Sequence, residues 1–246
     1  MRLTCQPLLI QPGDNELPVF ADDGRRVALW ASRQDWSCSD HLLRLLILGP
    51  EPIALPAPEP SEPAVGAVAR LDRAVRGQGG IIALLNPAEA FGAERIAFAE
   101  GIRLFAITEP ADEACWDAML SLARPVYGLR GTIACDCLSL HPGALISALA
   151  YGNFVCEEGL TLAAFDEHRA GVNWRADVDT EAAVIVRGGF EAARVFGRTV
   201  VWRDRGSEGY VRLVIRGGGG AVWTQPRFVA AVTPTAPTTP TANHGC

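Results

Sequence analysis

The sequence predicts an α/β fold: a partial or distorted β/α barrel with a β-rich N-terminal segment and an antiparallel β appendage at the C-terminal end. Two observations lead to this prediction. Helical and extended patterns alternate between residues 64 and 152, which is typical of parallel strands with covering helices. Short extended runs separated by turn signals stand before and after this region.

Composition limits the size and the class of the protein. A chain of 246 residues with 49% hydrophobic and 20% charged residues has enough apolar surface for one large domain, or for one domain with an appendage. All basic residues are arginine, which excludes Schiff-base lysine chemistry and a phosphate-binding P-loop. The net charge of −6 argues against general binding of nucleic acid or of an anionic membrane.

Location follows from what the sequence lacks. It has no uninterrupted apolar run of the roughly 18 residues that a membrane span needs, and no basic segment followed by an apolar signal core. Its 7 cysteines, an odd number, fit reduced thiols better than a disulfide framework. We therefore expect a cytoplasmic protein whose partners are small molecules or proteins.

The N-terminal segment, residues 1–49, reads as short strands joined by turns. The strands are expected at Leu3–Ile10, Pro18–Ala21, Arg26–Ser32 and Leu43–Leu48. Closely spaced prolines then fill residues 50–63, and since proline can neither continue a helix nor donate within a sheet, this segment is expected to be a surface loop and a boundary.

Residues 64–159 form the alternating region. Helices are expected at 64–76, 89–100, 112–123 and 143–152, with strands at 81–85, 102–108 and 126–134 between them. The appendage, residues 160–232, shows extended runs with partial period-two alternation and should be an antiparallel sheet or sandwich. The Thr/Pro-rich tail 233–246 is expected to be disordered.

Three blocks resemble one known family when taken together. They are residues 79–87, a buried strand that runs into Asn86-Pro87; residues 125–129 followed by Asp136 and by the segment 148–159; and residues 209–226, which end in Trp-Thr-Gln-Pro. Their order resembles the stand-alone phosphoesterase-like branch of the PHP (polymerase and histidinol phosphatase) metallohydrolases. The resemblance implies a distorted barrel whose strand ends hold two or three Zn, Mn or Fe ions and hydrolyse phosphate esters.

The resemblance also implies that most metal ligands have been lost. Asn86 stands where the family has a histidine, and Ala106 stands where it has a bridging glutamate. The closing Asp-x-His is represented at best by Asp136 with His141, and no pair of histidines forms a His-x-His. Asn86-Pro87 is alternatively an ordinary turn. Either the first part of the barrel is lost or the true start lies upstream of Met1.

The residues 135–141 hold the only cluster of metal-capable atoms close in sequence, namely Cys135, Asp136, Cys137 and His141. A continuous strand would place both cysteines on one face and Asp136 on the other, so that all three would not bind one ion without a bend. The cysteines are alternatively small buried hydrophobic residues.

Three glutamates complete the candidates. Glu109 follows a strand, at the barrel end where catalysis would occur, next to Asp112, which is a natural helix cap. The pair Glu157-Glu158 would suit acid-base work or lie in a solvated loop.

Our leading hypothesis is a PHP-like protein that has lost most metal ligands, holds no cofactor and serves as a non-catalytic binding or scaffold domain. The alternative is a metal-dependent phosphoesterase with a reduced site around Asp136, His141 and Glu109, with Cys135 as a further ligand and Zn, Mn or Fe as the metal. A third hypothesis is an interaction module in the appendage that exposes Trp174, Trp202 or Trp223, which are otherwise core residues.

Overall fold

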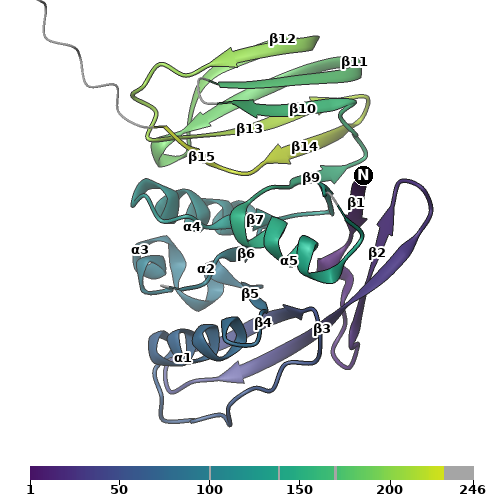
Figure 1. Cartoon of the computed structure of the whole chain (residues 1–246). Helices are drawn as coiled ribbons and strands as arrows, with labels where there is room; N and C mark the ends of the chain where they lie inside the picture. Colours follow the sequence, from purple (N-terminus) through teal and green to yellow (C-terminus); the bar gives the residue numbers. More distant parts are fainter. Residues whose placement is uncertain (100, 138, 169–170, 230–246) are drawn as a thin grey trace, which may run out of the picture.

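The computed structural model describes residues 1–99, 101–137, 139–168 and 171–229, and the tail 233–246 lies outside them. The predicted β/α barrel is wrong. The described strands form one mixed sheet of 15 strands, and parallel pairing occurs only between β5 and β6 and between β6 and β7 (Figure 1). All other ladders in this part of the chain are antiparallel, apart from one isolated bridge.

The elements have the following bounds. The first nine strands are β1 (Arg2–Cys5), β2 (Glu16–Ala21), β3 (Arg26–Ser37), β4 (Leu42–Gly49), β5 (Ile81–Leu84), β6 (Leu104–Ala106), β7 (Tyr127–Leu129), β8 (Thr132–Asp136) and β9 (Val155–Glu158). The others are β10 (Ala164–His168), β11 (Gly171–Val186), β12 (Phe190–Arg203), β13 (Tyr210–Gly217), β14 (Gly220–Thr224) and β15 (Arg227–Phe228). The helices are α1 (Ala64–Arg76), α2 (Pro87–Ala90), α3 (Gly92–Arg95), α4 (Pro110–Ser121) and α5 (Pro142–Tyr151), with short 3-10 turns at Pro7–Leu9, Ile96–Phe98 and Arg187–Gly189.

The barrel fails to form because the extended stretch 126–134 is not one strand. It breaks at Gly131, whose φ of 53° is left-handed and whose added Cβ would lie 2.7 Å from the Glu157 carbonyl oxygen. After this turn β8 leaves β7 and pairs antiparallel with β1 and β9. The N-terminal strands continue the same sheet, since β4 pairs antiparallel with β5. Local hairpin pairing therefore replaces the parallel order that a barrel needs.

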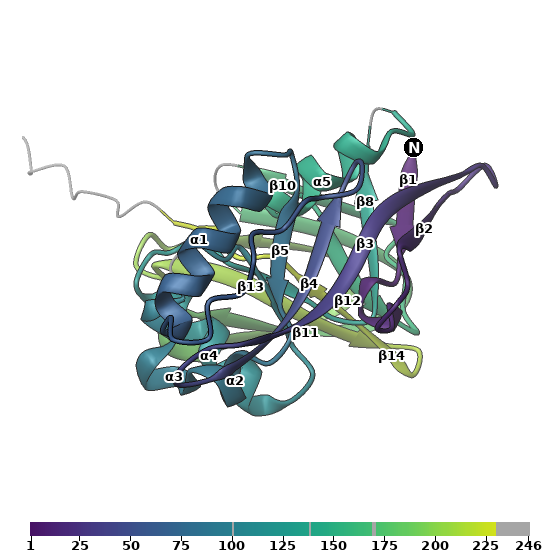
Figure 2. The same ribbon diagram turned by 90° about the horizontal axis from the view of Figure 1, so that it is seen from below.

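Helices cover both faces of the central strands. Leu46 and Leu48 of β4 belong to the core around α5, whereas Leu45 and Ile47 belong to the core beneath α1 and α4. This alternation follows from the period of two along a strand. Figure 2 shows α1 and α5 on different sides of β4 and β5.

The C-terminal strands enclose a third core. The 16-residue β11 pairs with β12, while its first part also pairs with β10 and its second part with β13. Trp174 and Trp202 lie in this core and Trp223 in the core around α5, with exposed fractions of 1%, 7% and 9%. Because all three tryptophans are buried, they offer no exposed aromatic patch for an interaction module.

A buried ion-pair cluster joins α4 to β13. Arg212 is 1% exposed and binds the Asp117 carboxylate twice, from Nε to Oδ1 at 3.0 Å and from Nη2 to Oδ2 at 2.7 Å. Nη2 also donates to Glu113 Oε1 at 2.8 Å, and the guanidinium lies 4.7 Å from the centre of the Trp116 ring. The Tyr210 hydroxyl donates to Asp117 Oδ1 at 2.6 Å. We call these five residues the Arg212 cluster.

None of the described helices combines the length and the apolar character that crossing a membrane requires.

Candidate functional site

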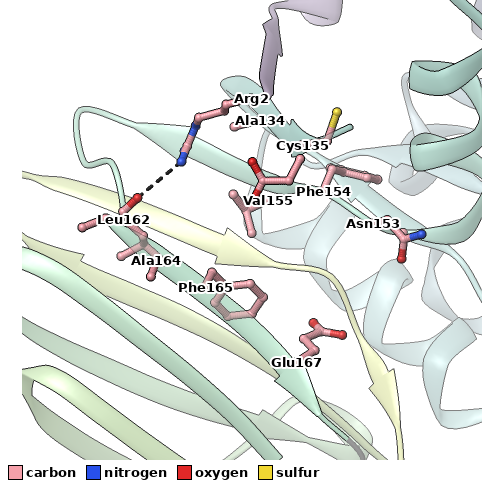
Figure 3. Close-up of a pocket in the computed structure, with 13 residues that line it drawn as sticks. Arg2, Ala134, Cys135, Asn153, Phe154, Val155, Leu162, Ala164, Phe165 and Glu167 are labelled. Atoms are coloured by element: carbon pink, nitrogen blue, oxygen red, sulfur yellow. Dashed lines mark hydrogen bonds between the residues drawn. The ribbon is translucent and has the colours of Figure 1, made fainter. Parts of the chain in front are cut away.

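A cavity of about 440 Å³ opens between β8 and β10 (Figure 3). Four segments that are distant in sequence line it: Arg2 of β1, residues 134–136 of β8, residues 152–155 after α5, and residues 162–165 with Glu167. We call it the β8–β10 cleft. Its volume lies within the range of small-molecule sites.

Arg2 fixes one wall of the cleft by joining three segments. It lies directly opposite Asp136 in the β1–β8 ladder, but its guanidinium turns to other partners. Nη1 donates to the Leu162 carbonyl oxygen at 3.3 Å, as Figure 3 shows, and Nη2 forms an ion pair with Glu157. Glu157 is 8% exposed and also accepts a hydrogen bond from Thr161 at 3.2 Å. The charge of Arg2 is therefore already neutralised.

This ion pair also shows whether Glu157 and Glu158 form the predicted pair of acid-base carboxylates. Glu157 is buried against Arg2, whereas Glu158 is exposed and lies 3.5 Å from Arg130 Nε. Adjacent residues of a strand point to opposite faces, so that the two carboxylates do not converge. The structure does not assemble them as an acid-base pair.

The floor of the cleft depends on the end of α5. Gly152 has a φ of 72°, and a Cβ at this position would lie 2.3 Å from Tyr127 Cε1. Both its backbone conformation and its contact therefore require glycine. The Tyr127 ring packs edge-on against Phe154, with 6.5 Å between the ring centres. This packing fixes Asn153 and Phe154, which Figure 3 shows beside the cavity.

The opposite wall is β10. In its ladder with β11, Phe165 pairs with Trp174 and Glu167 pairs with Val172. Cross-strand partners share a face of the sheet, so Phe165 and Glu167 lie on the face of the buried Trp174 and Val172, and at this edge Phe165 is half-buried and Glu167 exposed. Figure 3 shows their side chains on the same side of the strand.

The electrostatic environment of Glu167 reflects this position. Desolvation by the surrounding protein raises the pKa of Glu167 although part of the side chain stays exposed, and Asp166 adds to the rise while Arg227 opposes it. In the described part of the chain, neither Glu167 nor Asp136 has a hydrogen-bonded or ion-paired side chain as partner. The cleft therefore carries two unpaired carboxylates from two different strands.

The cysteines near the cleft are buried, as the alternative interpretation of the sequence predicts. Cys135 and Cys137 are 3% and 9% exposed, their sulfur atoms are 3.2 Å apart, and the intervening Asp136 is exposed. Desolvation, and then the contact with Cys137, raise the pKa of Cys135. Burial raises the pKa of Cys5 and of Cys156 to about 12. Since metals bind thiolate, these protonated thiols are poor ligands.

The predicted ligands His141 and Glu109 serve as helix caps. His141 is the N-cap of α5, and its Nδ1 accepts a hydrogen bond from the Gly143 amide at 3.0 Å. Glu109 is the N-cap of α4 and forms a capping box with Asp112. Asp112 is 2% exposed and also accepts hydrogen bonds from Thr108, at 3.1 Å from the amide and 2.8 Å from the hydroxyl. Neither cap lines the β8–β10 cleft.

Asn86 and Ala106 have structural roles. The Asn86 carboxamide extends the hydrogen bonding between β4 and β5, since Oδ1 accepts from the Arg44 amide at 2.9 Å and Nδ2 donates to the Leu42 carbonyl at 3.1 Å. Asn86 is 5% exposed and begins α2 together with Pro87, in agreement with the alternative that it is a turn residue. Ala106 is 1% exposed at the end of β6.

The predicted candidates thus lie apart. Asp136 and Cys135 line the cleft, while His141, Glu109, Asn86 and Ala106 do not. Within the residues that the structure describes, no three His, Cys, Asp or Glu side chains are grouped so as to hold a metal.

Sequence reasoning missed three residues of the cleft: Arg2, Phe165 and Glu167. Within the appendage, the extended run over residues 160–165 predicts a strand that ends at Phe165, whereas β10 begins at Ala164 and continues to His168, so Glu167 lies outside the predicted strand. Period-two alternation of Phe165 with Glu167 is the signal that would have placed both on one face. Comparisons of the chain with protein-family models, with curated proteins and with solved structures find no match.

Proposed function

We propose that this protein is a non-catalytic binding protein whose small-molecule ligand occupies the β8–β10 cleft. One observation carries the proposal: the cleft is a formed cavity of about 440 Å³ with a phenyl ring and two unpaired carboxylates in its walls. An apolar cavity with a few convergent polar groups is the usual form of a ligand site.

The structural roles of the other candidate residues support the non-catalytic part of the proposal. A phosphoesterase needs metal-capable side chains that converge. Here Glu109 and His141 cap helices, and Asn86 bonds to the backbone of β4. These interactions stabilise the fold, and they hold the three side chains at separate places instead of around one metal.

The resemblance to the PHP metallohydrolases enters the proposal through Asp136. This residue matches the closing metal-ligand strand of the family, and it lies in the cleft. We propose that the ligand site occupies the place of the former metal ligand after its companions were lost. The resemblance supports the position of the site at Asp136 and does not indicate which ligand binds there.

The first experiment tests for catalysis. Purified protein is analysed for bound metal by mass spectrometry and assayed for p-nitrophenyl phosphate hydrolysis with added Mn²⁺ or Zn²⁺. We expect no turnover above that of an Asp136→Asn variant. Stoichiometric metal together with turnover that depends on it would contradict the proposal and favour the phosphoesterase.

The second experiment tests the cleft itself. Ala163 lines the cavity and is exposed, and it precedes Phe165 by two residues, so that Ala163→Trp places an indole on the Phe165 side without disturbing a core. A small-molecule library is screened by thermal shift against the wild type and Ala163→Trp, with Ala192→Trp on the exposed part of β12 as the matched control. We expect stabilising ligands whose effect is lost only in Ala163→Trp.

A further inference from the structure

We propose that Cys135 and Cys137 form a redox modification site, at which a small-molecule disulfide such as glutathione disulfide oxidises the two thiols to one intramolecular disulfide. Their sulfur atoms are 3.2 Å apart, and both side chains lie in the core around α5. The inference goes beyond the proposed function and does not depend on it, because no ligand of the β8–β10 cleft takes part.

The end of β8 brings the two thiols together. β8 ends at the exposed Asp136, whereas the cysteines on either side of it are buried. Residues two apart in a strand share a face and lie about 6.6 Å apart along it, within the roughly 4.4–6.8 Å that a disulfide spans between Cα atoms. Cys137 lies beyond the last residue of β8, and its amide donates to the Met1 carbonyl oxygen at 2.9 Å. The sulfur atoms need to approach by only about 1 Å to form a bond of about 2.05 Å.

Two other cysteines of the same core, Cys5 and Cys156, lie too far away to compete. Both are paired with Ile133, Cys5 on β1 and Cys156 on β9, so each lies one diagonal step from Cys135. Diagonal neighbours are about 7–8 Å apart between Cα atoms, and two strand spacings separate Cys5 from Cys156 by about 9.6 Å. Cysteines more than about 7 Å apart are bridged only if the backbone moves. The strand register therefore selects Cys135 and Cys137.

The exposure of the two thiols sets the order of the reaction. Cys137 is 9% exposed and Cys135 is 3% exposed, so that Cys137 meets the oxidant first. The Cys137 thiolate attacks one sulfur of the small-molecule disulfide, whose S–S bond breaks and releases one thiolate. Cys135 Sγ loses its proton, attacks Cys137 Sγ in this mixed disulfide and releases the second thiolate. The protein loses two electrons and two protons, and the oxidant is reduced to two thiols.

Burial keeps the pair reduced until such an oxidant is present. Desolvation, and then the contact with Cys137, raise the pKa of Cys135, so that little of this thiol is ionised. The second step proceeds because the attacking sulfur is held beside its target, which raises its effective concentration far above that of a free thiol. A disulfide between residues so close in sequence closes a very small loop and gains little stability, so a pool of reducing thiols reverses it.

The experiment incubates the full chain with glutathione disulfide or with the smaller, uncharged bis(2-hydroxyethyl) disulfide. Remaining thiols are blocked with iodoacetamide, and the products are located by peptide mapping with fragmentation, because Cys156 lies in the same tryptic peptide. In the folded protein we expect the disulfide between Cys135 and Cys137 to be at least about tenfold more abundant than any other intramolecular pairing. Dithiothreitol should return both residues to free thiols.

Single variants test the order of the two steps. Cys135→Ser should retain the oxidant as a stable mixed disulfide on Cys137, whereas Cys137→Ser should leave Cys135 unmodified. Cys5→Ser is the matched control, since it removes another buried cysteine of the same core and should form the cross-link like the wild type. Circular dichroism of each variant establishes that it is folded, and the peptide map of the wild type tests the cross-link without any variant.

The outcomes that overturn the inference are distinct from those that overturn the proposed function. Absence of the cross-link from the folded chain with both oxidants would overturn the inference. A cross-link that forms only in urea, or preferential pairing of Cys135 with Cys5 or Cys156, would overturn it too, because the fold would then not hold the two thiols together. The proposed function is tested separately by the ligand screen and the phosphatase assay.

Discussion

The Arg212 cluster and the β8–β10 cleft both lie where the C-terminal strands meet the rest of the chain, and both contain carboxylates near an arginine. In the Arg212 cluster the arginine binds Asp117 and Glu113 and is almost completely buried. In the cleft, Arg2 binds Glu157. Among the described residues, Asp136 and Glu167 then have no ion-paired side chain.

The difference shows how one contact surface divides into a structural part and an available part. Every carboxylate of the Arg212 cluster has a donor, and burial together with the hydrogen bond to Asp117 raises the pKa of Tyr210, so that its hydroxyl stays protonated and donates. The Gly189 amide in turn donates to the Tyr210 oxygen at 3.1 Å. Among the described residues the buried Arg212 Nη1 has no hydrogen-bond partner, so the network satisfies its carboxylates but not every donor. Bonds of this kind to buried carboxylates rigidify a contact. In the cleft, Asp136 and Glu167 have no hydrogen-bonded or ion-paired side chain among the described residues.

The largest effect is expected from breaking the Arg212 cluster. Arg212→Ala leaves Asp117 buried without its counter-charge, and such a loss typically costs about 3–5 kcal/mol. Urea denaturation followed by fluorescence measures the free energy of unfolding. The control is Arg194→Ala, which removes an exposed arginine paired with Glu181 and Glu191 and should cost much less. Equal losses for the two variants would remove the distinction between the buried and the exposed ion pairs.

A smaller effect is expected at Asn86, a buried polar contact without charge. Asn86→Ala orphans the Arg44 amide and the Leu42 carbonyl, which should lower the free energy of unfolding by about 1–3 kcal/mol. Asn86→Asp keeps the acceptor for Arg44 and should lose less than Asn86→Ala. A variant Asn86→His that bound Zn²⁺ with gain of stability would contradict the structural role assigned here. Zn²⁺ titrations monitored by thermal shift provide that measurement.

The smallest effect on stability is expected in the cleft, and its sign depends on pH. The pKa of Glu167 is raised in the folded state, so the folded protein holds this proton more tightly than the unfolded chain. Stability from this group is present below the unfolded pKa and is lost as the pH rises through the raised folded pKa. Glutamine does not titrate, so Glu167→Gln does not lose stability as the pH rises. Compared with the wild type, the variant should therefore be more stable at about pH 7 than it is at about pH 4.

Denaturation at both pH values measures this difference, with Glu158→Gln as the control that should show none. Because Arg227 and Asp166 act electrostatically on Glu167, the same titration is repeated with Asp166→Asn. If the free energies of unfolding of the wild type and of Glu167→Gln differ by the same amount at both pH values, the Glu167 carboxylate is solvated like an ordinary surface group.

Single elements were predictable from local pattern, whereas their pairing was not. The helix expected at 64–76 coincides with α1, because its apolar residues recur at helical spacing. The helix expected at 89–100 instead breaks into α2, α3 and a 3-10 turn around Phe91 and Gly92. The parallel order failed for a non-local reason: β8 pairs with β1, and no pattern within residues 126–134 specifies a partner at residues 2–5.

The site was predictable only in part, for the same reason. Asp136 was singled out because of its neighbours in sequence, and it does line the cleft. His141 was singled out by the same argument and Glu109 because it follows a strand, yet their local position at helix starts gave them capping roles. Glu167 could be placed only from the β10–β11 register, which puts it on the same face as Phe165.

The four-residue strand β1 has a consequence for the order in which the molecule forms. In the sheet it stands between β2, which follows it closely in sequence, and β8, which is far along the chain. During synthesis one edge of β1 therefore stays open until β8 has emerged, and such long-range pairing is slow and exposes an edge to wrong partners. Arg2 belongs to this strand, so the cleft acquires its first wall only when the two halves of the sheet have joined.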